Sequence, residues 1–209
     1  MRDREFDRWA SIYDESISQS LNSFPFYGYF EVLSEVRDIV APRKGLKVID
    51  VGIGTGLLSH KLAEDGCRIY GVDFSKEMIE KAKTRIPDGE FDVVDITADH
   101  FGRFNSEKFD RVISSYCLHH LNDRQKVKFF QRTIENNLSE NGKIIIADIG
   151  FETESSFNIA RDEYGESWED EEDGEYYMCG EKMVDLLRGM GISVIYKQVS
   201  SCAGILLYA

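Results

Sequence analysis

Residues 48–56 place a carboxylate and three alternating glycines directly after an apolar run, and this pattern suits ligand binding. The run contains Asp50, and the glycines that follow are Gly52, Gly54 and Gly56. Glycine lets a backbone turn tightly and approach a ligand without a Cβ clash. A second carboxylate, Asp73, ends the next apolar run about 20 residues later, the spacing at which nucleoside-binding folds hold ribose hydroxyls. The spacing therefore predicts a site for a nucleoside-containing ligand.

The position of the last glycine separates three kinds of nucleotide site. A dinucleotide fingerprint, G-x-G-x-x-G, needs a glycine where this chain has Leu57. A G-x-x-x-x-G-K-[ST] phosphate loop needs a lysine after the last glycine, and none stands there. The D-x-G-x-G-x-G pattern that does fit resembles the first motif of class I S-adenosylmethionine (SAM) methyltransferases. The Asp50 carboxylate suits the ammonium and sulfonium of SAM and would repel the pyrophosphate of NAD, so an NAD-binding oxidoreductase is the weaker alternative.

Two further strand ends carry side chains suited to the adenosine part of SAM. Asp73 would accept both ribose hydroxyls, with Phe74 or Met78 lying on the adenine face. After the third strand, Asp95 would accept the adenine amino group while Ile96 packs on the ring. The structural alternative for Asp73 is a solvated strand end.

The fourth predicted strand ends in Ser114-Ser115-Tyr116, and two adjacent histidines follow. Ser114 or Ser115 would offer a carbonyl to the methionine ammonium, because ligands of open α/β sheets bind beyond the carboxyl ends of strands. Imidazoles are candidates for a general base. The alternative is that one histidine faces the core or caps the next helix. The candidate catalytic residues are His119, His120 and Tyr116, with Asp148 as a further helper.

Three aromatic residues, Phe6, Trp9 and Tyr13, recur at helical spacing before the first strand. One interpretation is a helix packed on the sheet. The other is a lid over the cofactor, with Trp9 or Tyr13 touching the methionine end, where an aromatic face would attract the sulfonium. We expect a helical lid over residues 1–42.

Residues 162–175 form an abrupt acidic segment in which nine of 14 positions are Asp or Glu. Charge runs are usually solvated or disordered. The alternative is an acidic rim that attracts a cationic acceptor, such as an amine.

Apolar runs and helical patterns alternate after residue 45. Strands are predicted over 47–51, 69–73, 91–94, 110–115, 143–149, 192–199 and 203–208. Helices are predicted over 5–40, 57–65, 76–85, 123–138 and 178–189. Such alternation indicates βαβ units around a mainly parallel sheet covered on both faces. Only three residues separate the last two strands, so that pair must be antiparallel.

Composition narrows the class of protein further. The 209 residues are enough for one domain with a proper core. A net charge of -13 argues against a nucleic-acid partner, because such binding depends on neutralising phosphates. Four scattered cysteines without a C-x-x-C pair predict reduced thiols, a cytoplasmic location and no metal site. No apolar run approaches membrane-spanning length, so we expect no membrane association.

Several motifs together are similar to those of small bacterial SAM-dependent methyltransferases. They are the F-x-x-W-A-x-x-Y-D opening from Phe6, the glycine motif, G-V-D ending at Asp73, S-S-Y with H-H-L ending at Leu121, and G-K-I-I-I-A-D ending at Asp148. The resemblance implies a Rossmann-like, doubly wound α/β sheet of seven strands in the order 3-2-1-4-5-7-6, with the last strand antiparallel. It also implies one methyltransferase domain over 1–209, with SAM bound by 43–209. A small-molecule methyl acceptor is expected, and a SAM-binding protein without chemistry is the non-enzyme alternative.

Overall fold

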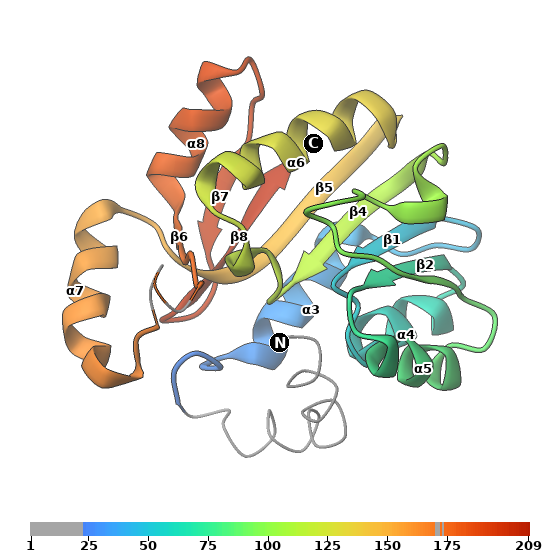
Figure 1. Ribbon diagram of the computed structural model, residues 1–209, viewed down its shortest axis with the longest axis horizontal. Helices are drawn as coiled ribbons and strands as arrows, with labels where there is room; N and C mark the ends of the chain where they lie inside the picture. The colour runs from blue at the N-terminus through green and yellow to red at the C-terminus, as the bar shows by residue number, and fades with distance from the viewer. Residues whose placement is uncertain (1–22, 170–171, 173) are drawn as a thin grey trace.

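Strands and helices alternate along the chain (Figure 1). The computed structural model describes residues 23–169, 172 and 174–209. The α-helices are α3 (Tyr29–Val40), α4 (Leu57–Glu64), α5 (Lys76–Arg85), α6 (Asp123–Asn136), α7 (Glu154–Tyr164) and α8 (Gly180–Gly189). The strands are β1 (Lys47–Val51), β2 (Arg68–Asp73), β3 (Glu90–Val93), β4 (Phe109–Ser115), β5 (Leu138–Phe151), β6 (Met178–Cys179), β7 (Ile195–Gln198) and β8 (Ala203–Tyr208). Short 3-10 turns are η1 (Gly102–Phe104), η2 (Leu118–His120) and η3 (Gly165–Ser167).

The sheet has the strand order β3-β2-β1-β4-β5-β8-β7. Strands β1 to β5 pair in parallel, whereas β8 lies antiparallel between β5 and β7. The predicted order and the reversed last strand are therefore confirmed. One strand was missed: β6 adds two residues beside the end of β5, where the sequence predicted the start of a helix. Helix α8 consequently begins at Gly180 and not at residue 178.

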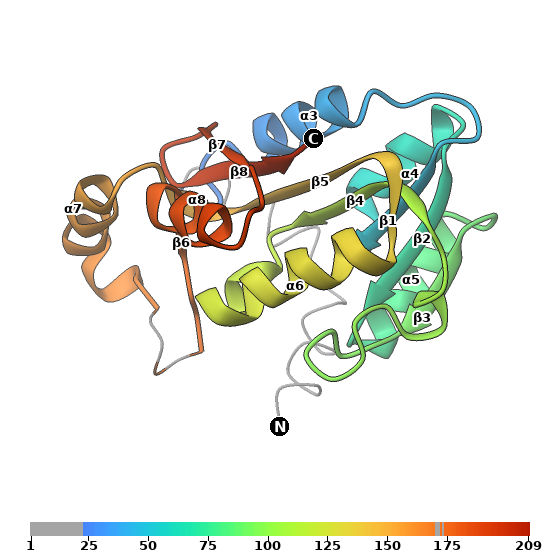
Figure 2. The same ribbon diagram turned by 90° about the horizontal axis from the view of Figure 1, so that it is seen from above.

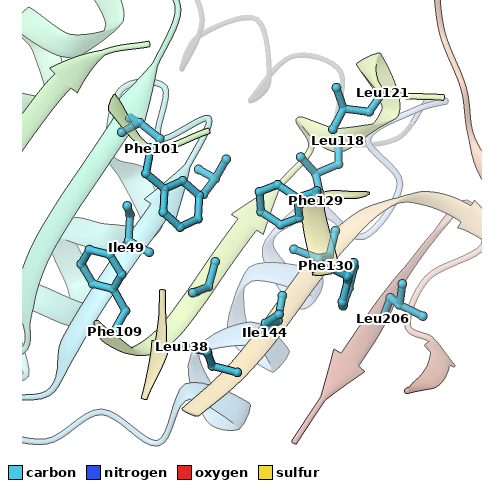
Figure 3. Close-up of a cluster of buried hydrophobic side chains, with 14 of the residues drawn as sticks. Ile49, Phe101, Phe109, Leu118, Leu121, Phe129, Phe130, Leu138, Ile144 and Leu206 are labelled. Atoms are coloured by element: carbon cyan, nitrogen blue, oxygen red, sulfur yellow. The ribbon is translucent and has the colours of Figure 1, made fainter. Parts of the chain in front are cut away.

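Two hydrophobic layers cover the sheet because neighbouring residues of a strand point to opposite faces. Val48 packs in the layer that α3, α4 and α5 cover, and Ile49 packs in the layer under α6 and α8. Figure 2 shows α3 and α6 on opposite sides of the sheet, and Figure 3 shows the second layer, where Phe129 and Phe130 of α6 lie over Ile144 of β5. Within the described part of the chain, no helix has the length and apolar character needed to cross a bilayer.

Side-chain caps start α5 and α6, in the connections that follow β2 and β4. Ser75 accepts a hydrogen bond of 3.2 Å from the Met78 backbone at the start of α5. Asn122 and Gln125 form a reciprocal capping box at the start of α6. Such caps satisfy backbone N–H groups that the first helical turn leaves free. The caps fix where each helix begins, and this limits the conformational freedom of the loop between the helix and the preceding strand.

The loop after β1 packs tightly on the loop after β4. Gly52 has a φ of 72°, and a Cβ at this position would lie 2.2 Å from the Cys117 sulfur. Glycine is required here both for the left-handed backbone and for the close approach. The contact joins the loops that follow β1 and β4. These two strands are neighbours in the sheet, and the strand order runs outward from them in opposite directions.

We predict that Gly52→Ala lowers the free energy of unfolding by about 2–4 kcal/mol. The left-handed conformation costs about 1–2 kcal/mol for an L-residue, and overpacking against Cys117 costs about 1–3 kcal/mol. Chemical denaturation of Gly52→Ala, Cys117→Gly and the double variant checks this. The cost of the Gly52 change should shrink in the Cys117→Gly background, because that change removes both the sulfur at 2.2 Å and the Cβ at 2.5 Å from the new methyl group. Additive effects would contradict the proposed contact.

Candidate functional site

A cavity of about 960 Å³ lies beyond the carboxyl ends of the parallel strands. On one side it is lined by residues at the ends of β1, β2 and β3, which we call the first half. On the other side it is lined by residues that follow β4 and β5, which we call the second half. The lining includes twelve of the predicted site residues, namely Asp50, Gly52, Gly54, Asp73, Phe74, Met78, Asp95, Ile96, Ser115, Tyr116, His119 and His120.

Asp73 holds the glycine loop in place at the end of β2. Its two carboxylate oxygens accept backbone N–H bonds of 2.9 Å, one from Gly54 and one from Ser75. The same residue also lines the cavity. The side chain is 8% exposed, which excludes the alternative of a solvated strand end.

Asp50 is a buried carboxylate at the floor of the glycine loop. One of its oxygens accepts a 2.6 Å hydrogen bond from the Ser59 hydroxyl. Burial raises the pKa of Asp50 to about 7, the Ser59 hydrogen bond opposes the rise, and the charge of Asp73 adds to it. A cation bound beside Asp50 would stabilise the ionised carboxylate and lower its pKa.

The three glycines of the motif have different roles. Gly52 packs on Cys117, as described above. At Gly54 a Cβ would meet no heavy atom within 4 Å, so the backbone there faces open cavity. Gly56 is absent from the lining; it adopts a left-handed conformation at the start of α4 and packs against Ile86. Its role in this structure is to turn the chain into the helix.

The side chains predicted to meet an adenine ring lie together in the first half. Phe74 and Met78 line the cavity beside Ile96. Asp95 also lines it and uses one carboxylate oxygen to accept bonds from the Thr97 backbone and hydroxyl, at 2.8 and 2.6 Å. The arrangement gives one carboxylate at the edge of an apolar slot, as a purine with an exocyclic amine requires.

The three site residues predicted at the end of β4 differ in whether they line the cavity. Ser114 is fully buried and donates a 2.7 Å hydrogen bond to the Val51 carbonyl, so its side chain does not line the cavity. Ser115 and Tyr116 do line it. Tyr116 has a φ of 52°, a conformation that L-residues adopt at a cost. Among the described residues, no hydrogen-bond partner exists for the buried hydroxyls of Ser115 and Tyr116.

Tyr116 sits against the helix that precedes the sheet. Its ring centroid lies 4.9 Å from that of Tyr29 and 6.1 Å from that of Phe26, and all three rings line the cavity. Burial raises the pKa of the Tyr116 hydroxyl above its usual range. The group therefore keeps its proton and acts as a hydrogen-bond donor.

His119 and Asp148 form a buried ion pair in the second half. Asp148, at the end of β5, accepts bonds from the His119 backbone N–H at 2.9 Å and contacts the ring Nδ1 at 2.5 Å. Burial would lower the pKa of His119, but the Asp148 and Glu175 carboxylates raise it overall. Burial would likewise raise the pKa of Asp148, yet the charge and hydrogen bond of His119 hold it below its usual range. The pair fixes the ring with Nε2 turned away from Asp148.

Glu175 completes this group, and sequence reasoning did not single it out. One carboxylate oxygen lies 3.5 Å from His119 Nε2, and the other lies 3.0 Å from His120 Nδ1. The next residue anchors it, since the Tyr176 N–H donates to the His119 carbonyl at 2.6 Å and its carbonyl accepts from buried Lys126 at 2.5 Å. The acidic composition of 162–175 pointed to the segment, but no local pattern distinguished this carboxylate from its neighbours.

The rest of the acidic segment divides between solvent and cavity. Asp162, Glu163, Glu166 and Glu172 are exposed, as the solvated interpretation predicts. Glu169 lines the cavity together with Glu175. Asp170, Glu171 and Asp173 lie outside the described residues, as do Trp9 and Tyr13, so the cofactor contacts predicted for those two aromatics stay predictions.

The predicted helical lid over residues 1–42 includes a helix that belongs to the core. Val32, Val36 and Val40 of α3 have no exposed surface and pack in the layer with α4 and α5. Phe24 and Phe26, which precede α3, line the cavity. The described part of this segment therefore forms a wall of the site and a packed helix.

Comparison with known proteins identifies the family. Residues 42–187 match the family described as "Methyltransferase domain". An uncharacterized methyltransferase of Geobacillus thermodenitrificans is 32% identical over 201 residues, covering 92% of this chain and 89% of that protein. Another, from Alkaliphilus oremlandii, is 32% identical over 152 residues, covering 71% of this chain and 68% of the relative.

Solved structures of SAM methyltransferases share the fold. The DhpI–SAM–HEP complex superposes with a TM-score of 0.73 at 18% identity, covering 99% of this chain and 94% of that one. Magnesium protoporphyrin IX methyltransferase from Synechocystis PCC 6803, with S-adenosylhomocysteine bound, gives a TM-score of 0.67 at 18% identity, covering 99% and 98%. With the glycine loop and its paired carboxylates, these matches place the chain in the class I SAM-dependent methyltransferase family.

Proposed function

We propose that this methyltransferase transfers the methyl group of SAM to a small-molecule acceptor bound in the second half of the cavity. The observation that carries the proposal is one continuous cavity that extends from the Asp73 carboxylate to the His119 and Tyr116 side chains. Its volume of about 960 Å³ lies at the upper end of the range for small-molecule sites, roughly 300–1,000 Å³. Such a cavity has room for a cofactor and a small acceptor side by side.

The residues of the first half fit SAM. The Asp73 carboxylate, which lines the cavity, suits the ribose diol, and Asp95 suits the adenine amine. Asp50 would hold the methionine ammonium, because its buried carboxylate has a neutral hydroxyl partner in Ser59 and gains from a cation. The open space above the Gly54 backbone provides room for the chain between these groups.

Orientation supplies most of the proposed catalysis. Bound SAM provides a methyl group that its sulfonium has already activated. The protein must then hold an acceptor in line with it and exclude water, which can account for a large part of the barrier lowering. Tyr116 would position the acceptor through its protonated hydroxyl. His119 and His120, which line the same half, are the candidates for a general base toward the acceptor.

The charge of the second half bears on the acceptor. Glu169 and Glu175 both line the cavity, and the carboxylates of exposed neighbours add to the negative potential at its rim. This supports the hypothesis that the rim favours a positively charged ligand over an anionic one.

We predict that Asp73→Asn weakens SAM binding at least tenfold. The change removes the charge that strengthens the hydrogen bonds to the ribose, each worth roughly 1.5–3 kcal/mol. Isothermal titration calorimetry measures the affinity. Asp92→Asn is the matched control, since Asp92 also accepts two backbone N–H bonds, from Val93 and Arg103, but lies outside the cavity lining. Equal affinities for the two variants would contradict the ribose role.

SAM affinity should fall about tenfold between pH 8 and pH 6. With a pKa of about 7 in the free protein, Asp50 is mostly ionised at the higher pH and mostly protonated at the lower one. A bound ammonium stabilises the ionised form and lowers the pKa, so binding releases a proton and weakens as the pH falls. Asp50→Asn should bind more weakly at pH 8 and lose most of this pH dependence. Parallel profiles for the wild type and the variant would refute the assignment.

An acceptor screen tests the proposed function itself. Purified protein is incubated with SAM labelled in the methyl group, and label transfer is followed to separate panels of small alcohols, thiols, amines and carboxylic acids, and to protein and RNA fractions. We expect transfer to a member of a small-molecule panel and none by Asp73→Asn. Transfer to protein or RNA alone would contradict the small-molecule acceptor.

A further inference from the structure

Three donor atoms from two distant segments converge in the second half of the cavity. They belong to His119, His120 and Glu175, and each lies within 4.8 Å of the other two. All three side chains line the cavity. The Glu175 side chain is only 12% exposed, so this carboxylate is not part of the solvated rim. The expectation of no metal site rested on the scattered cysteines, and this group of donors contains no cysteine.

The spacing of these atoms matches a metal coordination shell. Bonds of about 2.0–2.2 Å from an ion to nitrogen and oxygen ligands place neighbouring ligands about 3.0–3.6 Å apart. Two separations fall in this range, 3.0 Å from His120 Nδ1 to one Glu175 oxygen and 3.5 Å from His119 Nε2 to the other, and one donor atom of each residue lies within 4.8 Å of the other two. Two imidazoles and one carboxylate are also a donor set that divalent transition metals prefer.

Asp148 gives His119 the orientation that a metal ligand needs. Metal-binding histidines commonly donate their second ring N–H to a carboxylate, which fixes the tautomer and makes the free nitrogen more basic. Here Nδ1 contacts Asp148, and Nε2 points to Glu175. Asp148 itself is 1% exposed and bonded to two backbone N–H groups, those of His119 and Ile149, so it cannot turn away.

The backbone holds the third ligand against the first two. The bond from the Tyr176 N–H to the His119 carbonyl ties residue 175 to the turn η2. Lys126, 2% exposed, secures the Tyr176 carbonyl from α6. The donor atoms are thus supported by buried contacts, and their convergence is not a chance meeting of mobile surface side chains.

We propose that His119, His120 and Glu175 bind one divalent transition-metal ion, for which Zn²⁺ is the probe. Three protein ligands leave at least one coordination position open, and in catalytic zinc sites that position takes water or substrate. Because the three ligand residues line the cavity, the open position would be within reach of an oxygen or sulfur atom of an acceptor bound there. This last step rests on the proposed function, whereas the ion site itself does not.

Direct metal titration tests the site without SAM or any acceptor. Full-length, tag-free protein, treated with chelator and dialysed, is titrated with Zn²⁺ by calorimetry at neutral pH. We expect one ion per chain with micromolar or tighter affinity. Glu175→Gln and His120→Ala should each weaken binding at least tenfold. Co²⁺ substitution should give visible absorption bands in the wild type that Glu175→Gln loses.

A surface pair provides the matched control. His60 Nε2 lies 3.6 Å from Glu64 on α4, on the outside of the molecule. His60→Ala should leave the affinity and stoichiometry unchanged. Absence of stoichiometric binding by the folded wild type, or equal loss in His60→Ala and Glu175→Gln, would overturn the proposal. Thermal unfolding confirms that each variant is folded. Because neither SAM nor acceptor is present, a failed metal site leaves the proposed methyl transfer untouched, and failure of the acceptor screen leaves the metal result valid.

Discussion

The hydrogen bond from the Gly54 N–H to Asp73 is the interaction on which the arrangement of the first half depends. Parallel pairing of β1 with β2 sets Val51 beside Val72, so the glycine loop and Asp73 emerge at the same edge of the sheet. The carboxylate then fixes the loop above it and the start of α5 beside it, through Gly54 and Ser75. A single buried charge thereby defines the shape of the loop and the placement of a helix, and the same residue lines the cavity.

The two halves of the cavity handle buried charge in different ways. In the first half, the hydroxyl of Ser59 is the one side chain among the described residues that hydrogen-bonds to Asp50, and burial raises the pKa of this carboxyl, so its ionised form is costly without a cation. In the second half, Asp148 is compensated by His119 and two backbone N–H groups, and its pKa is lowered. A positively charged ligand would stabilise the ionised form of Asp50, whereas Asp148 is already stabilised by groups of the protein itself. Figure 1 shows the corresponding division of the fold, with α4 and α5 at one side of the sheet and α7 at the other.

Sequence reasoning predicted the elements whose signals are local. The apolar runs predicted the strands, and the resemblance to the methyltransferase family implied their order. The glycine spacing with Asp73 indicated the cofactor half, because a parallel sheet brings strand ends to one edge. Glu175 could not be identified, since its place depends on a backbone bond between Tyr176 and His119 across the fold. Alternation along β4 turns the Ser114 side chain to Val51, while Ser115 faces the cavity, and the carbonyl contact predicted for one of the two serines stays a prediction. Gly56 has the motif's spacing, yet it serves the turn into α4.

The sources of the two halves in the chain have an evolutionary consequence. The strand-end residues of the first half come from one stretch, residues 50–97, whereas the far wall of the second half comes from Ser167, Glu169, Glu175 and Tyr177, beyond β5. Under the proposed function, drift or insertion in the connection between β5 and α8 would change which acceptors the second half binds, while the stretch proposed to bind SAM stays intact. The residues proposed to bind SAM and those proposed to select the acceptor thus lie in different parts of the chain. Related enzymes can therefore acquire new products through changes in a single connection.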